Sequence, residues 1–143
     1  MKKLLLTAVV AFCTLFASAQ IMVVTTYDGD LEGADQITSN MGIGYQVTDV
    51  ITAGVNKSGD DYSVFVRYTV KDDIYATFNM PTKDGSDLAN IGLGYSMNVW
   101  NNLYIEPSYT MPIKEQAVLD ADGVATDKME RAGSFNFGLA YRF

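Results

Sequence analysis

The sequence predicts an all-β protein, an eight-stranded antiparallel up-and-down β-barrel formed by residues 20–143 and preceded by a leader. Three observations support this fold class: apolar and polar residues alternate with a period of two, short and long connections take turns between the strands, and one six-residue pattern recurs in four of them. The chain has 143 residues, of which 48% are hydrophobic. The segment after the leader suits one domain and is too short for two.

Residues 1–19 have the three-part pattern of a secretory signal peptide. Lys2 and Lys3 precede an apolar run, and the small residues of Ala17–Ala19 form the predicted cleavage site. The apolar run is too short to span a bilayer as a helix. A retained N-terminal anchor helix is the alternative. Cleavage would also remove Cys13, the one cysteine of the chain, and would leave neither a disulfide nor a thiolate metal site.

Eight segments show the alternation expected of a β-strand with one apolar face. It is clearest in the last segment, where Phe135, Phe137 and Leu139 fall on one face and small or polar residues fall on the other. The predicted strands are Gln20–Tyr27, Ile37–Val47, Val50–Lys57, Tyr62–Val70, Ile74–Met80, Asn90–Val99, Leu103–Pro112 and Ala132–Phe143.

The connections between these segments are alternately short and long. The short ones are tight turns, and the long ones are rich in Asp and Gly. This alternation is typical of barrels in the bacterial outer membrane, whose short turns and termini are periplasmic. The predicted short turns are Thr48–Asp49, Lys71–Asp73 and Trp100–Asn102, and the predicted long links are Asp28–Gln36, Ser58–Asp61, Pro81–Ala89 and Ile113–Arg131.

An internal repeat ends each even-numbered strand with a tyrosine. The copies are Asn40–Tyr45, Asn90–Tyr95 and Asn136–Tyr141, with Ser63–Tyr68 as a degenerate fourth. Each tyrosine is on the apolar face, within a few residues of the predicted periplasmic end of its strand. Amphipathic rings prefer the headgroup level of a membrane, so the sequence predicts an aromatic girdle. Its predicted members are Tyr45, Tyr68, Tyr95, Trp100 and Tyr141.

The polar face consists mostly of Gly, Ser, Thr, Asn and Ala, which suit the narrow lumen of an eight-stranded barrel. Arg67, Glu106 and Arg142 all fall on this face. A Lys or Arg facing lipid at the midplane would cost about 2–4 kcal/mol, so this placement favours a membrane barrel. We expect Glu106 to pair with Arg67 or Arg142 in the lumen. At Pro107, which removes one ladder hydrogen bond, we expect a bulge or a lumen water.

Charge and composition argue against several classes of function. The net charge of −7 disfavours a nucleic-acid partner. The chain has no histidine, so it lacks the usual partner of a catalytic Ser or Asp, and we expect no enzyme and no cofactor. The loop Asp28–Gly33 resembles the start of an EF-hand, but Ser39 stands where the bidentate acid is needed. We therefore predict no metal site.

The last strand carries a recognisable motif: a polar residue, Gly, an aromatic residue and a C-terminal Phe, here Asn136, Gly138, Tyr141 and Phe143. With the leader and the eight strands, the chain resembles the small outer-membrane β-barrel superfamily of OmpA/OmpX-like and opacity-type barrels. The resemblance implies that the barrel-assembly machinery reads these four residues as an insertion signal.

We expect a monomeric, non-enzymatic barrel integral to the bacterial outer membrane, with a structural or surface-interaction role. Its partners would be outer-membrane lipid, lipopolysaccharide and, during insertion, the assembly machinery. Two alternatives remain open: a narrow small-solute channel of the porin type, and a soluble secreted β-barrel that binds an apolar ligand.

Overall fold

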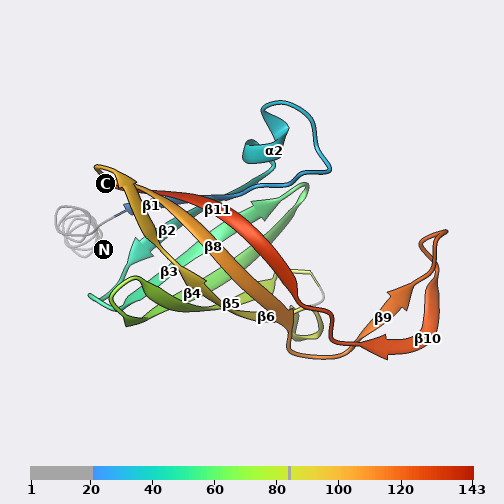
Figure 1. Cartoon of the computed structure of the whole chain (residues 1–143). Helices are drawn as coiled ribbons and strands as arrows, with labels where there is room; N and C mark the ends of the chain where they lie inside the picture. The colour runs from blue at the N-terminus through green and yellow to red at the C-terminus, as the bar shows by residue number, and fades with distance from the viewer. Residues whose placement is uncertain (1–20, 84) are drawn as a thin grey trace, which may run out of the picture.

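The computed structural model describes residues 21–83 and 85–143, which form a closed barrel of eight antiparallel strands (Figure 1). The predicted signal peptide and Gln20 lie outside the described residues. The sixth strand is divided into two segments, β6 and β7. The barrel strands are β1 (Ile21–Thr26), β2 (Asn40–Gln46), β3 (Ile51–Ser58), β4 (Asp61–Lys71), β5 (Ile74–Pro81), β6 (Asn90–Tyr95), β7 (Met97–Trp100), β8 (Leu103–Pro112) and β11 (Ser134–Arg142).

The barrel closes because β11 pairs with β8 on one side and with β1 on the other. The remaining pairs join neighbours along the chain, so every barrel strand has a partner on both sides. Closure also brings the two ends of the described chain together, since the Phe143 N–H donates to the Ile21 carbonyl at 2.8 Å. The Arg142 N–H also donates to the carbonyl of Asn102, in the turn between β7 and β8, at 3.0 Å, so these two chain ends lie at the end of the barrel that carries this short turn.

The large apolar side chains point away from the barrel axis, as the alternation predicts. Ile43 and Leu93 are 64% and 61% exposed, and Ile91 and Phe137 are also exposed. The buried apolar residues are few and face inward: Met22, Phe65 and Ala140 form one cluster among the described residues. This chain has its apolar surface outside and its polar surface inside, the reverse of a soluble globular domain.

The outward apolar residues form continuous rows across neighbouring strands. Ile43 on β2 pairs with Val55 on β3, and Val55 pairs with Val64 on β4. A second row follows Phe78, Ile91 and Met111 from β5 to β8. Cross-strand neighbours on one face are close enough to pack together, so the rows merge into one band around the barrel.

Three connections differ from the prediction. Ile37 and Thr38, expected to begin the second strand, instead belong to the short helix α2 (Asp35–Thr38), whose turn is closed by the Thr38 N–H donating to the Ala34 carbonyl. The link Ser58–Asp61, predicted to be long, is a tight turn in which Gly59 has a φ of 58°. The last link contains a separate hairpin of β9 (Gln116–Leu119) and β10 (Ala125–Glu130), outside the barrel (Figure 1).

The bulge expected at Pro107 does not occur. Gly94 pairs with Ser108 and Met97 pairs with Ile105, so the register does not shift across Ser96. Instead the sixth strand is interrupted between β6 and β7. In this register Pro107 stands opposite Tyr95, and it has no N–H to donate to the neighbouring strand.

Inward-facing glycines leave room for the buried rings. A Cβ on Gly94 would lie 2.3 Å from the Tyr75 ring. A Cβ on Gly54 would lie 2.5 Å from the Phe65 ring and 2.3 Å from the backbone oxygen of Ile43. The Tyr75 and Phe65 rings thus each require a glycine beside them, because the lumen is too narrow to hold a ring and a neighbouring side chain at the same place.

We predict that Gly94→Ala destabilises the barrel by about 1–3 kcal/mol through overpacking, and that it costs less in a Tyr75→Leu background, where the ring is gone. Gly54→Ala should keep most of its cost in a Phe65→Leu background, because the added Cβ would still lie 2.3 Å from the Ile43 carbonyl oxygen. The free energy of unfolding from urea titration of the refolded barrel measures both cycles. Equal costs of Gly94→Ala in the two backgrounds would contradict this account.

Candidate functional site

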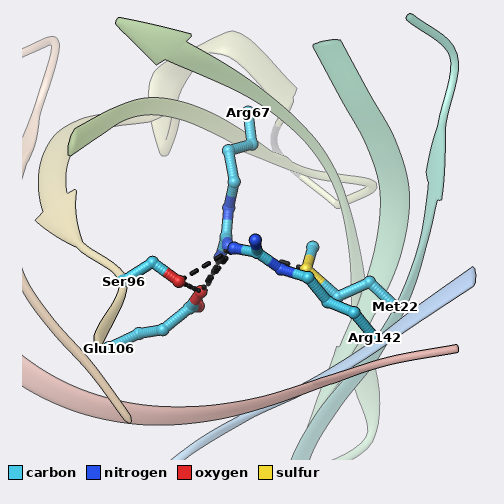
Figure 2. Close-up of polar contacts among 5 residues, drawn as sticks. All are labelled: Met22, Arg67, Ser96, Glu106 and Arg142. Carbon is cyan, nitrogen blue, oxygen red and sulfur yellow. Dashed lines mark hydrogen bonds and ion pairs between the residues drawn. The ribbon is translucent and has the colours of Figure 1, made fainter. Parts of the chain in front are cut away.

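An ion pair across the lumen is the centre of the candidate site. Arg67 comes from β4 and Glu106 from β8, and both side chains enter the barrel (Figure 2). The Arg67 Nη1 and Nη2 atoms donate to the Glu106 Oε1 and Oε2 atoms, each at 2.8 Å. Glu106 is only 3% exposed. This bidentate, charge-assisted geometry is the strong form of an Arg–carboxylate pair.

A second arginine reaches the same carboxylate through a serine. The Ser96 hydroxyl donates to the Glu106 Oε1 atom at 2.7 Å and accepts from the Arg142 Nη2 atom at 2.8 Å. Arg142 Nη2 also lies 3.5 Å from Glu106 Oε1. The structure therefore brings together the three charged residues that the sequence placed on one face. Two positive groups and one negative group leave this cluster with a net positive charge.

Aromatic rings cover both guanidinium groups. The Arg67 guanidinium carbon lies 3.9 Å from the centre of the Tyr75 ring, and that of Arg142 lies 4.0 Å from the centre of the Tyr104 ring. Cation–π contacts of this kind are stronger where water is excluded. Arg67 Nη1 also donates to the Met22 sulfur at 3.6 Å. The excess positive charge is therefore partly balanced by ring faces.

Sequence reasoning missed Ser96, Tyr75 and Met22 as members of this cluster. Ser96 lies between Gly94 and Asn98 on the small-residue face, so its inward direction could have been inferred from the alternation. Tyr75 lies in a strand where neither face is clearly polar, and its direction becomes evident only from its pairing with Gly94. Met22 lies in the equally ambiguous β1.

Two cavities occupy the lumen on either side of the Arg67 side chain. The cavity toward the short turns has a volume of about 170 Å³ and reaches Asp49, Asp72 and Asp73. The cavity toward the long links has a volume of about 450 Å³ and extends to the ends of the strands. Arg67 and Tyr75 line both cavities. The ion pair and its covering ring thus lie where the two spaces meet.

The predicted girdle residues are on the outer surface near the short turns. Tyr68, Tyr95, Trp100 and Tyr141 are exposed, and Trp100, the one tryptophan of the chain, is 72% exposed. Tyr45 is half-buried. The Tyr95 hydroxyl donates to the Asp73 carboxylate at 3.5 Å, so its polar end points toward the β4–β5 turn.

The four girdle tyrosines are staggered along their strands. The row of cross-strand partners through Tyr45 reaches β4 at Val66, two residues before Tyr68. The row through Tyr68 reaches β6 at Leu93, two residues before Tyr95. The rows through Tyr95 and Tyr141 likewise reach β11 and β2 at positions before their tyrosines. Barrel strands are tilted, so a row of cross-strand partners shifts along the barrel axis from one strand to the next. The stagger of the tyrosines compensates for this shift and places the four rings at nearly the same height along the axis.

The C-terminal motif occupies β11 and the residue after it. The Asn136 side chain donates to the Thr110 hydroxyl at 3.0 Å inside the lumen. A Cβ on Gly138 would lie 2.9 Å from the Thr25 carbonyl oxygen, so this position favours glycine. Outside the barrel, the Tyr141 and Phe143 rings meet edge to face at 4.8 Å. The motif thus contributes both a lumen contact and an outer aromatic pair.

The acidic loops use their carboxylates locally. Asp28 Oδ1 accepts from the Asp30 N–H at 3.1 Å, and Asp120 Oδ1 accepts from the N–H groups of Asp122 and Val124 at 3.0 and 2.9 Å. Both carboxylates therefore close turns. Among residues 21–83 and 85–143, no group of three or more His, Cys, Asp or Glu side chains is placed to hold a metal ion.

In the part of the chain that the structure describes, no helix has the length and apolar character needed to cross a membrane. No model of a known protein family matches the chain. No curated protein matches it either.

We predict that Glu106→Ala destabilises the barrel by about 3–5 kcal/mol, because it leaves Arg67 without its counter-charge. Replacing both partners, as Arg67→Met with Glu106→Leu, should recover most of that loss. The matched control is Asp61→Ala, which breaks an exposed ion pair with Lys83 at 3.0 Å and should change stability by less than about 0.5 kcal/mol. Urea unfolding followed by Trp100 fluorescence measures all three. A Glu106→Ala loss no larger than that of Asp61→Ala would refute the central role of the pair.

Proposed function

We propose that this chain is an integral outer-membrane β-barrel with a structural or surface-interaction role, and that it catalyses no reaction. The observation that carries the proposal is the band of large apolar side chains around the outside of a closed barrel. Ile43, Val55, Phe78 and Phe135 are all exposed members of it. A soluble monomer rarely exposes contiguous apolar patches of this extent, whereas hydrocarbon would cover them.

The length of the strands supports the same environment. The longest are β4, β8 and β11, with 11, 10 and 9 residues. Ten residues extend about 34 Å, and a strand tilt of about 40° reduces this to about 26 Å along the barrel axis. That height is close to the apolar band of about 25 Å seen in outer-membrane barrels. Closure of the barrel gives the backbone N–H and C=O groups at the sheet edges hydrogen-bond partners, which hydrocarbon cannot provide.

The placement of charges is also consistent with lipid around the barrel. Arg67 and Glu106 are in the lumen, and Arg142 reaches into it. Lys57 faces outward by parity, but it is one residue from the end of β3, where its long side chain can reach the headgroups. The staggered tyrosines and Trp100 would form the girdle at the opposite interface.

The two ends of the barrel support one orientation. The short turns and both ends of the described chain would face the periplasm, and α2 and the β9–β10 hairpin would face the outside of the cell (Figure 1). Surface links rich in Asp could approach lipopolysaccharide through divalent cations. On insertion, the motif Asn136, Gly138, Tyr141 and Phe143 would be read by the barrel-assembly machinery.

Lumen chemistry favours this proposal over the alternatives. A barrel that binds an apolar ligand would need an apolar interior, but the larger cavity is lined mainly by amides and hydroxyls. A channel would need a continuous path, but Arg67 and Tyr75 lie between the two cavities. Both oxygens of Glu106 are already bound by Arg67, so the carboxylate is poorly placed to act as a general base.

The first test is heat-modifiable migration of the chain extracted with detergent from an outer-membrane fraction. We expect an unboiled band that runs faster than the boiled one, because a closed barrel resists unfolding by detergent at room temperature. Recovery of the folded chain in the soluble fraction without detergent would reject the membrane assignment.

The second test compares two leucines of equal exposure. Leu93 on the barrel wall and Leu119 on the β9–β10 hairpin are both 61% exposed. In lipid vesicles, Leu93→Arg should destabilise the barrel by about 1–4 kcal/mol, depending on its depth, because the charge would face hydrocarbon. Leu119→Arg should cost less than about 0.5 kcal/mol. Equal, small effects on the free energy of unfolding would indicate that water surrounds both positions.

A further inference from the structure

The larger cavity has the size of a small-molecule site. Its volume of about 450 Å³ lies within the range of about 300–1,000 Å³ that is usual for ligand pockets. All eight barrel strands contribute to its wall. Arg67 and Glu106 form its floor, and Asn40 and Asn90, at the ends of their strands, lie at its rim. A ligand would therefore enter from the end that carries the long links.

The wall chemistry favours a neutral ligand rich in hydroxyl groups. It contains five asparagines and eight serines or threonines, whose side chains both donate and accept hydrogen bonds. Among the described lining residues the charged ones are Arg67 and Glu106, which pair with each other, whereas Arg142, the source of the excess positive charge of the cluster, lines the smaller cavity. A charged ligand would lose its hydration without meeting a free counter-charge. A polyhydroxylated neutral molecule would instead exchange its hydrogen bonds to water for bonds to the wall.

Two buried atoms in the wall have no hydrogen-bond partner within the described protein: the Asn79 Oδ1 acceptor and the Arg67 Nε donor. Both residues line the cavity. Buried polar groups are almost always paired, so these two atoms mark positions in the wall where the protein itself does not complete the hydrogen bonding. A hydroxyl group can satisfy either atom, because it donates one hydrogen bond and accepts others.

We propose that this cavity binds a neutral mono- or disaccharide, with Asn79 and Arg67 as polar contacts. The inference requires a folded barrel but does not depend on lipid around it, so it can fail while the membrane assignment stands. The floor of the cavity would prevent passage of the sugar, which makes this a binding site and not a transport path.

The test uses the full chain, isotope-labelled and folded in micelles of a detergent without a sugar headgroup. The probes are glucose and maltose, with glucuronate as the charged counterpart. We expect a saturable shift of the asparagine side-chain amide signals on titration with one of the neutral sugars, and at least about tenfold weaker binding of glucuronate. The Trp100 indole signal, outside the barrel, should not move.

Variants separate binding in the cavity from binding elsewhere. Asn79→Leu keeps the side-chain size and removes the acceptor, so it should weaken binding about tenfold or more. Asn98→Leu is the matched control, on β7 beyond the ion pair, and should bind as the unchanged chain does. Thr77→Val, also in the cavity wall, tests the same point if Asn79→Leu does not fold. No saturable shift with either neutral sugar, equal binding of glucuronate, or unchanged binding by the folded cavity variant would overturn the proposal.

Discussion

The width of an eight-stranded barrel is the constraint on which the rest of this structure depends. The lumen holds a single layer of side chains, so each large inward residue requires small neighbours. Gly94 leaves the space that the Tyr75 ring occupies, and that ring lies against the Arg67 guanidinium. Arg67 in turn reaches Glu106 across the lumen. The absence of a side chain at Gly94 on β6 thus helps to position the ion pair between Arg67 on β4 and Glu106 on β8.

Polar contacts take the place of a large apolar core inside the barrel. The buried cluster of Met22, Phe65 and Ala140 is small. Cross-linking of the walls comes instead from Glu106, which is tied to the fourth and sixth strands through Arg67 and Ser96, and to the eighth through Arg142. The bonds between Arg67 and Glu106 are charge-assisted and sheltered from water, so each is stronger than its exposed equivalent, whereas the Arg142 side chain is 34% exposed. The same contacts divide the lumen into two spaces.

The parts of the fold that follow from periodicity were predictable. The eight strands, the inward direction of Arg67, Glu106 and Arg142, and the outward direction of the tyrosines all come from a period of two, which the sheet enforces. Local backbone preference was less informative. Ile37 continues an apolar alternation but belongs to the helix α2, because the turn from Ala34 satisfies its N–H locally.

The cavities and the aromatic covers could not be read from the sequence. Tyr75 and Tyr104 both face inward, but which guanidinium each ring contacts depends on strand stagger. The stagger is fixed by the registers of all the pairs together, whereas alternation gives only the face. Ser96 is buried for the same reason: its register position sets it opposite Glu106, beside the break caused by Pro107.

Among the described residues the β9–β10 hairpin pairs only within itself, and it joins the barrel wall through its two ends. An isolated two-stranded sheet is marginally stable, so this hairpin contributes little to the stability of the barrel. Its sequence is therefore free to diverge, lengthen or accept a foreign epitope while the scaffold beneath is preserved. Natural variation and display engineering would both concentrate there, because such changes leave the wall registers untouched.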